Sequence, residues 1–365
     1  MRCDLVPPES VDDAFCESWR ALAAGAVTPN PFHEPECVLP AVRELAPPGT
    51  VKLLTVTVGA ELRFLLPVHR VRRTRKLPLP GLAAWRHPYA FLANPLLARG
   101  TDPAETWEAV LGELSHRSYP PLLLLELFAA DDPSADALRA LARPTVFETH
   151  DRAVLHRRAD ATYLDGRMSG RHRKDLRRGR EQLAADLGGD LGCVDRAAED
   201  DATFEVALTD FLRLESAGWK GRDGGAIACR AEHERFFRAL AAGLRRHGRF
   251  ELWSLGAAGR TAAYQCNLLA GNTAFRIKAA YDEQVARHSP GVQLELDLMA
   301  VFHDDDRLQV VDSCTAAGSM TYEQLYADRR TVETWLVPLH GRRARLAAAA
   351  SPALARGYQR LRRSA

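Results

Sequence analysis

The first half of the chain alternates short apolar runs with longer amphipathic stretches, a pattern typical of a mixed α/β fold. Two strand-like runs between residues 51 and 69 meet at Gly59-Ala60, and this turn signal predicts a hairpin. The apolar run at residues 122–128 predicts a buried strand. The other elements predicted in this half are a strand near residues 85–92, helices at 103–116 and 134–141, the second with Ser134 as its N-cap, and a strand at 145–157.

The second half repeats this order of a hairpin, a strand, a helix, a strand, a helix and a strand. It begins with helices predicted at residues 169–187, 202–216 and 230–247. The pattern then predicts strands at 250–255 and 261–269, a turn at Gly271-Asn272, a strand at 275–281, a helix at 292–302, a strand at 308–312, a helix at 320–329 and a strand at 332–337. The repetition predicts two copies of one α/β unit, joined near residues 160–170. We therefore expect domains at residues 1–160 and 161–340, followed by a basic tail at 341–365.

One junction in the second half has the pattern of an anion site. The strand-like run 275–281 ends in a charged loop, which closes with Ser289-Pro290-Gly291 and leads into the next helix. A strand, a glycine turn and a fresh helix N-terminus place several free backbone N–H groups around one point. Such a point is suited to a phosphate or a diphosphate. The alternative is an ordinary turn that starts a helix.

Basic charge is clustered rather than spread over the molecule. The formal net charge of the 365 residues is only +2, which argues against a general polyanion binder. The predicted helix 169–187 and the residues just before it carry a dense basic set: Arg167, Arg171, Arg173, Lys174, Arg177, Arg178 and Arg180. The tail from Gly341 holds seven arginines and no acid. Both segments are predicted to be solvated faces. The alternative for the helix is a contact with phosphate groups, such as those of a tRNA backbone, and the alternative for the tail is a surface that contacts acidic lipid or RNA.

Cysteine usage and the apolar runs bear on the cellular compartment. The seven cysteines are scattered without a CxxC pair, which argues for free thiols and against a disulfide framework or a zinc site. The first residues do not resemble a signal peptide, and no apolar run approaches the roughly 20 residues that a membrane helix needs. We therefore expect a cytoplasmic protein.

Lysine is rare in this chain, with five lysines among the 49 basic residues. Where arginine is the default cation, a lysine can mark a site that needs a compact ammonium group. Lys220 and Lys278 lie in motif-like segments and are therefore candidates, whereas Lys52 and Lys76 are not.

Four segments, in order, resemble the GNAT superfamily of N-acetyltransferases, specifically the cellulose-biosynthesis-type branch related to the Fem peptidyltransferases. They read SGRHRKDLRRGREQLAADLG, LESAGWKGRDGGAI, IKAAYDEQVARHSPG and VVDSCTAAGSMTYEQLYADRR, and they span roughly residues 163–337. The segment NPFHEPECVLP and the residues from His87 to Leu96 resemble the family's degenerate first domain. The resemblance implies tandem GNAT-like domains, each a mixed twisted sheet flanked by helices.

The resemblance also implies a coenzyme A thioester as cosubstrate. Its pantetheine arm would pair with the exposed edge of strand 275–281 as an extra strand, and backbone N–H groups near Ile277, Lys278 and Ala279 would face the thioester carbonyl. The diphosphate would lie at the helix start, and the residues implied there are Ser289, Gly291, Val292 and Gln293, with Arg287 as the counter-charge. The alternative is a plain central strand followed by a turn.

Acyl transfer to an amine needs a proton acceptor for the amine and an acid for the leaving thiolate. Glu215 and Asp282 are the candidate bases, although water relayed by backbone carbonyls is an alternative. Related enzymes use a tyrosine as the acid, which implies Tyr322 or Tyr326. The candidate residues for the acceptor are Trp219, Lys220, Arg222, Asp312 and Ser313. For each candidate a structural role is the alternative: core packing for Trp219 and the tyrosines, a helix end capped by cations for Lys220, and a surface ion pair between Lys278 and Asp282.

The sequence therefore favours an N-acyltransferase that moves an acyl group, expected to be acetyl, from coenzyme A to an amine of a small-molecule or sugar-linked acceptor. The product would belong to cell-envelope or secondary metabolism. An aminoacyl-tRNA-dependent transferase is the rival enzyme, because the basic helix and tail would suit tRNA. A non-catalytic binding module with the same fold is the third interpretation.

Overall fold

The computed structural model describes residues 1–74, 79–315 and 320–363. The chain divides into two compact units, one formed by Met1–Asp151 with Arg330–Ala365 and the other by Arg152–Arg329. The second unit is therefore a continuous segment, whereas the first is completed by the C-terminal residues. The residues 316–319 of the fourth sequence motif, and Lys76, lie outside the described part of the chain.

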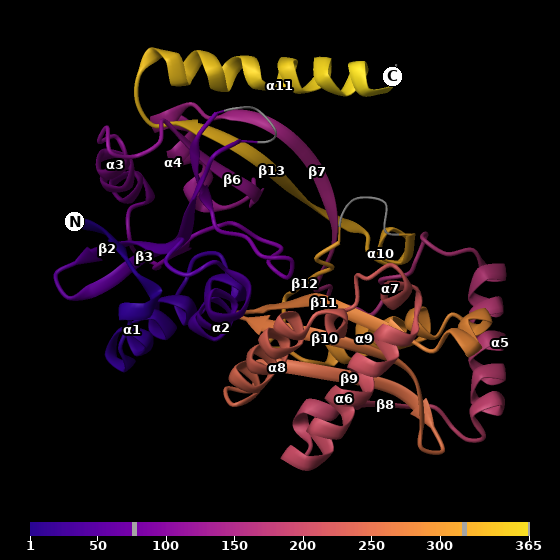
Figure 1. Cartoon of the computed structure of the whole chain (residues 1–365). Coiled ribbons are helices and arrows are strands. Elements are labelled where there is room, and N and C mark those ends of the chain that lie inside the picture. The colour runs from indigo at the N-terminus through magenta and orange to yellow at the C-terminus, as the bar shows by residue number, and fades with distance from the viewer. Residues whose placement is uncertain (75–78, 316–319, 364–365) are drawn as a thin grey trace. The chain divides into compact units, whose positions relative to one another are not determined.

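The first unit is built on a mixed sheet with the strand order β1-β2-β3-β4-β6-β13 (Figure 1). Its strands are β1 (Arg2–Val6), β2 (Val51–Val58), β3 (Glu61–Val71), β4 (Gly81–Ala84), β5 (Leu96–Leu97, paired with β3), β6 (Leu122–Ala129) and β13 (Asp328–Pro338). Its helices are α1 (Asp13–Ala24), α2 (Pro35–Leu45), α3 (Pro103–Leu114), α4 (Pro133–Ala142) and α11 (Arg342–Arg363). Strands β4 and β6 run parallel, and the other neighbours in this order run antiparallel.

The two faces of this sheet bury different helices. Trp107 on α3 and Leu138 on α4 pack with alternate residues of the strands, among them Trp335. The opposite side chains include Leu336, which packs with Ala344 and Ala348 of α11. The predicted basic tail is therefore helical, but a stripe of small residues on it is buried rather than solvated. The motif-like segment NPFHEPECVLP is also buried, and burial lowers the pKa of His33 to about 4.

The second unit contains a mixed sheet that starts from the end of β7 (Thr145–His156) and continues in the order β12-β11-β10-β9-β8. The strands are β8 (Gly192–Asp195), β9 (Phe250–Ala257), β10 (Arg260–Ala270), β11 (Thr273–Tyr281) and β12 (Val310–Asp312). The helices are α5 (Gly170–Leu187), α6 (Asp201–Ala217), α7 (Trp219–Arg222), α8 (Ala231–Arg245), the 3₁₀ segment η5 (Glu283–His288), α9 (Pro290–Asp304) and α10 (Met320–Leu325). Strands β11 and β12 are parallel, and the remaining pairs are antiparallel.

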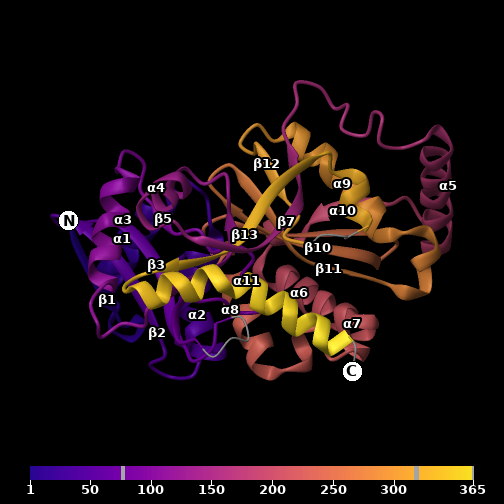
Figure 2. The same cartoon turned by 90° about the horizontal axis from the view of Figure 1, so that it is seen from above.

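Alternate residues of β9 show which helices cover each face of this sheet. Phe250 packs against Phe204 of α6 and Phe237 of α8. Leu255, an odd number of residues away, lies in a cluster with residues of α5 and α9, including Leu298. Successive side chains of a strand point to opposite faces. Helices α6 and α8 therefore cover one face, and α5 and α9 cover the other (Figure 2).

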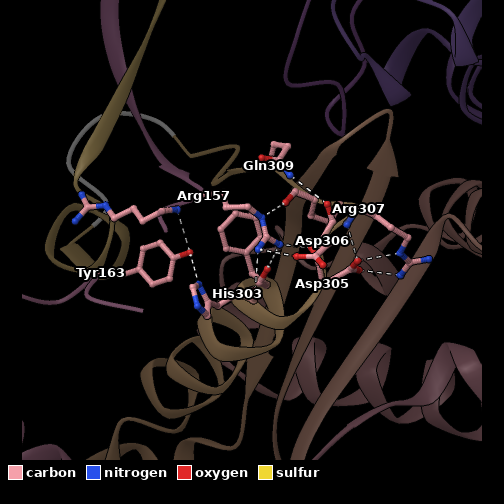
Figure 3. Close-up of polar contacts among 10 residues, drawn as sticks. Arg157, Tyr163, His303, Asp305, Asp306, Arg307 and Gln309 are labelled. Carbon is pink, nitrogen blue, oxygen red and sulfur yellow. Dashed lines mark hydrogen bonds and ion pairs between the residues drawn. The ribbon is translucent and has the colours of Figure 1, made fainter. Parts of the chain in front are cut away.

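Arg157, directly after β7, ties the end of α9 to the start of β12 (Figure 3). Its guanidinium donates to Leu308 O at 2.7 Å, His303 O at 2.8 Å and Phe302 O at 2.8 Å, and also to Asp305 O. The last carbonyls of a helix lack partners within the helix, and a cation there also matches the helix dipole. Arg157 therefore fixes the C-terminal end of α9, whose other end borders the candidate site.

The structure confirms the predicted fold class, two mixed α/β units with helices on the sheets. The predicted strand near residues 85–92 is wrong: β4 ends at Ala84, and Pro88 has no N–H with which to continue a ladder. The predicted N-cap Ser134 is also wrong, because Asp132 caps α4 by accepting from Ser134 N at 2.7 Å and Pro133 takes the first turn. The Ser169 cap of α5 is confirmed by its bond from His172 N at 3.2 Å. Within the described residues, no helix combines the length and apolar character required to cross a membrane.

Candidate active site

The outer edge of β11 is only partly used by the sheet. Its pairing with β12 covers three residue pairs, the last being Phe275 with Asp312. On its other side β11 pairs with β10 as far as Tyr281. The register shifts between Lys278 and Arg276, so that Ile277 is the extra residue of a β-bulge. A bulge bends its strand. Within the described strands, the outer edge from residue 276 onward therefore has no strand partner.

A cavity of about 430 Å³ opens beside this edge. All of its lining residues belong to the second unit. They come from β11 and the Ser289 corner, from the α6–α7 segment, and from η5, β10, α9 and α10: Ala279, Ala280, Tyr281, Ser289, Pro290, Gly291, Val292, Leu214, Glu215, Gly218, Trp219, Lys220, Glu283, Ala286, Gln265, Glu295, Thr321 and Tyr322. The edge of β11 and the start of α9, which the sequence analysis predicted to form one site, therefore border the same cavity.

The corner before α9 leaves fewer backbone donors than the sequence predicts. Ser289 adopts a left-handed conformation with φ of 53°, and its carbonyl accepts from Val292 N at 2.9 Å and from Gln293 N at 3.0 Å. The expected diphosphate contacts from these two N–H groups are therefore not open in this structure. The Gly291 N–H has no acceptor among the described residues. A Cβ built on Gly291 would meet no atom within 4 Å, so the position faces open space.

Arg287 and Gln293 are both engaged away from the corner. Arg287 forms an ion pair with Asp186 of α5, and His288 Nε2 lies 2.8 Å from the same carboxylate. The hydrogen bond with His288, helped by Arg287, lowers the pKa of Asp186. The Gln293 amide donates to Leu176 O at 2.8 Å. These contacts attach α5 to the start of α9, and they make Arg287 and Gln293 structural in this conformation.

Two lysines converge on one buried carboxylate at the cavity wall. Glu215 Oε1 lies 3.2 Å from Lys278 Nζ and 3.8 Å from Lys220 Nζ, and the Glu215 side chain has no exposed surface. Glu215 Oε2 accepts from Ile227 N at 2.8 Å. Lys220 also donates to Ala279 O at 2.6 Å, and burial lowers the pKa of Lys220. Glu215 lies on α6, and Lys220 lies on the short helix α7 that follows it.

Glu283, rather than Asp282, holds the loop above the cavity. Its carboxylate accepts from Trp219 N at 2.7 Å and forms two bonds with Arg222, at 2.8 and 3.0 Å. Asp282 was expected to share a strand face with Lys278, but β11 ends at Tyr281 and Asp282 caps η5 by accepting from Gln284 N at 2.9 Å. Trp219 is half-exposed at the cavity and does not pack in the core.

The two candidate tyrosines have different environments. Tyr322 lines the cavity, and its hydroxyl donates to Gln265 Oε1 at 3.2 Å. The hydroxyl of Tyr326 instead donates to Glu295, which also accepts from Arg276 Nη2 at 3.3 Å. Burial raises the pKa of both tyrosines, and it also raises the pKa of Glu295 against the opposing effect of Arg276. Tyr326 is fully buried and is absent from the lining of the cavity.

Asp312 and Ser313, at the end of β12, are fully buried and do not line the cavity. Asp312 lies 3.4 Å from Arg152 and accepts from Cys314 N at 2.8 Å. The Ser313 hydroxyl pairs with Thr315 Oγ1 at 2.9 Å. In this conformation both residues hold the strand end.

A model of the family described as "Acetyltransferase (GNAT) domain" matches residues 170–324. This stretch contains the whole lining of the cavity. Residues 170–324 are therefore similar to GNAT-type acetyltransferase domains. A comparison with the curated proteins finds no significant match.

Solved structures match over a longer part of the chain than residues 170–324. FemX matches with a TM-score of 0.58 at 11% identity, over 92% of this chain and 97% of that chain. L-PGS from Bacillus licheniformis matches with a TM-score of 0.52 at 12% identity, over 94% and 96%. A tandem GNAT protein from the clavulanic acid biosynthesis pathway aligns at 17% identity over 93% and 99%, with a TM-score of 0.46. At such identities the likeness to FemX and L-PGS concerns the fold alone.

The predicted residues divide into those that border the cavity of the GNAT-type domain and those that do not. The cavity is lined by Glu215, Trp219, Lys220, Ala279, Ser289, Gly291, Val292 and Tyr322. Its lining does not include Arg222, Ile277, Lys278, Asp282, Arg287, Gln293, Asp312, Ser313 or Tyr326. The polar lining residues that were missed include Gln265, Glu283, Glu295 and Thr321. Glu295 had a signal in the sequence, because it falls on the apolar side of helix 292–302.

Proposed function

We propose that this chain transfers an acyl group from a coenzyme A thioester to an amine by direct attack. The observation that carries the proposal is the outer edge of β11, which loses its strand partner after Phe275 and borders a cavity that ends at the start of α9. An extended arm with amide groups can add to such an edge as a strand. The GNAT-type match over the same residues supports this use of the edge.

The cavity supports a division of roles in this reaction. The amine nitrogen forms a bond to the acyl carbon, the carbon–sulfur bond breaks, and the thiolate takes a proton. Tyr322 is the proposed acid, because it borders the cavity and a phenol carries its proton at neutral pH. Of the proposed bases, Glu215 borders the cavity and Asp282 does not. The amine proton is therefore assigned to Glu215, directly or through water.

The proposed acceptor is an amine of a small-molecule or sugar-linked compound. The proposed donor is acetyl-CoA or a longer acyl-CoA, whose diphosphate would meet the Gly291 N–H at the start of α9. A helix N-terminus favours a negative charge through its free N–H groups and its dipole. A cytoplasmic setting, where acyl-CoA is made, would fit this donor.

Isothermal titration with acetyl-CoA and longer acyl-CoAs tests the proposal, and binding is expected for at least one of them. A negative charge placed at Gly291 tests where the diphosphate binds, because a side chain at this position fits without a clash. Gly291→Glu should weaken binding about tenfold relative to Gly291→Gln, because the carboxylate repels the diphosphate. No binding across the panel would exclude this function. Equal binding by the two variants would show that the diphosphate does not bind near Gly291.

One observation favours aminoacyl-tRNA as the rival donor. The N-terminal half of α5 is exposed and basic, and α5 is attached to the start of α9 through Leu176 and Asp186. A phosphate backbone placed along α5 would lead to the same corner. Filter binding of charged tRNA, with affinity that falls steeply as salt rises, would favour this donor. Absence of binding at low salt would exclude it.

A further inference from the structure

A side chain of this same chain holds part of the open edge of β11. Lys220 Nζ donates a 2.6 Å hydrogen bond to Ala279 O. Asp282 N–H donates to Ala262 O of β10. Because the backbone groups of a strand alternate between its two neighbours, Ala280 faces β10 and Ala279 faces the open side. The carbonyl that Lys220 holds is therefore one that an added strand would use.

The positive charge of Lys220 is only partly compensated in this position. Among the described residues, the one carboxylate at ion-pair distance from its ammonium is that of Glu215, at 3.8 Å. The same oxygen is closer to Lys278, at 3.2 Å. The Lys220 side chain keeps 25% of its surface exposed and borders the cavity. An ammonium that shares its counter-ion and faces a cavity favours an anionic ligand.

We propose that Lys220 exchanges partners between the two binding steps of the reaction. The donor arm takes the Ala279 carbonyl through one of its amide N–H groups, and the displaced ammonium then binds an anionic group of the acceptor. The inference rests on the acyl-CoA-dependent function proposed above. It implies that the donor binds first, and that the acceptor carries a carboxylate or a phosphate near its reactive amine.

The surroundings of Lys220 allow the side chain to move while its helix stays in place. Glu283 anchors α7 through the Trp219 N–H and the Arg222 guanidinium. The lysine ammonium sits on a flexible four-carbon stem and can change partners by rotation about its own bonds. Glu215 lies within reach of both positions and keeps the ammonium near the cavity. The exchange therefore needs no movement of the sheet.

The full-length variant Lys220→Met tests the exchange, because methionine removes the ammonium but keeps an unbranched side chain. Titration should show the acyl-CoA binding at least about tenfold tighter than to the wild type, since the donor no longer displaces a charged hydrogen bond. Turnover is then compared for three acceptors: an amino acid, an aminoalkyl phosphate and an amine without an anionic group. For the anionic acceptors kcat/KM should fall about tenfold or more, whereas the neutral amine should be affected little.

Lys278→Met is the matched control. Lys278 shares the Glu215 carboxylate but does not hold the Ala279 carbonyl in this structure, so no tightening of donor binding is expected. Simple damage to the fold would weaken donor and acceptor together, whereas the exchange moves them in opposite directions. Equal or weaker donor binding by a folded Lys220→Met, or the same tightening in Lys278→Met, would overturn the exchange. A wild type that binds no acyl-CoA would overturn the proposed function itself.

Discussion

The two neighbouring tyrosines of α10 and its C-terminal flank give a sharp test of the site. Tyr322 and Tyr326 lie one helical turn apart with their rings in an edge-to-face contact, 5.2 Å between centroids. Of these two described tyrosines, Tyr322 lines the cavity and Tyr326 does not. Tyr322→Phe and Tyr326→Phe each remove one oxygen atom and leave the ring in place. The first should affect turnover, and the second should affect stability.

The contacts of each hydroxyl set the expected magnitudes. Tyr322→Phe removes one bond to the neutral Gln265 amide, which costs about 1 kcal/mol of stability. Loss of a general acid lowers turnover by about 10²- to 10⁴-fold. Tyr326→Phe removes a donor from the buried Glu295 carboxylate, a bond of the charged class worth about 1.5–3 kcal/mol. Arg276 still pairs with Glu295, so the lower part of this range is expected.

Denaturant unfolding measures the free energy of each variant, and release of free thiol measures turnover with an acceptor found by the panel above. Acyl-CoA affinity should stay near the wild-type value in Tyr322→Phe, because the phenol acts on the leaving group. The opposite result would be a loss of turnover by about 10²- to 10⁴-fold in Tyr326→Phe and normal turnover in Tyr322→Phe. The acid would then be the buried Tyr326, which is bonded to Glu295 and does not line the cavity. That result would refute the assignment made from the cavity.

Three further predictions concern the supports of the site. Arg157→Leu should lower the free energy of unfolding by about 2–4 kcal/mol in denaturant titrations, because it removes the donors at the end of α9. The Arg307 side chain is exposed, so Arg307→Leu should change this free energy by less than about 1 kcal/mol. Equal losses in the two variants would contradict the role of Arg157. Gly221→Ala places a Cβ 1.8 Å from Ser216 O and should cost about 2–4 kcal/mol of stability in the same denaturant titrations. The Cβ of Gly225→Ala meets Lys220 O at 3.6 Å and should be tolerated, so equal losses in the two variants would contradict the close contact at Gly221. Burial raises the pKa of Asp195 from 3.8 to about 6, so the folded state binds the proton more tightly than the unfolded state. Wild-type stability should therefore fall by about 2 kcal/mol relative to Asp195→Asn as pH rises from 4 to 7, and parallel pH profiles of the two proteins would show that this carboxyl is not perturbed.

Local signals in the sequence located most of the elements around the site. The turn at Gly271-Asn272, the strand that follows it and the helix after Ser289-Pro290-Gly291 are set by residues close in the chain, and the structure places them as β11 and α9. One error arose where two local signals compete. At residues 132–134 both Asp132 and Ser134 can cap a helix, and the proline between them decides for Asp132 because it fits the first turn.

Contacts distant in the chain could not be read from the sequence in the same way. Glu215 and Lys278 are 63 residues apart, and no periodicity predicts that they meet at one wall. The choice between Tyr322 and Tyr326 likewise depends on Glu295 of another helix, which accepts from one of them and leaves the other at the cavity. The Val292 and Gln293 N–H groups were expected to be free, but the left-handed Ser289 turns its own carbonyl onto them.

The polar groups that border this cavity are largely satisfied within the protein before any ligand arrives. Glu215 is paired with lysine, Glu283 with Arg222 and Glu295 with Arg276, while the Tyr322 hydroxyl is bonded to Gln265. A ligand therefore gains little from adding a contact and more from replacing an existing partner with a better one. Such exchange favours ligands that match a released group in charge and geometry, because a poor match leaves a buried group unpaired. Selectivity at this site would then depend on which internal bonds break, and among the described residues the bond between Lys220 and Ala279 occupies the edge where the thioester arm would bind.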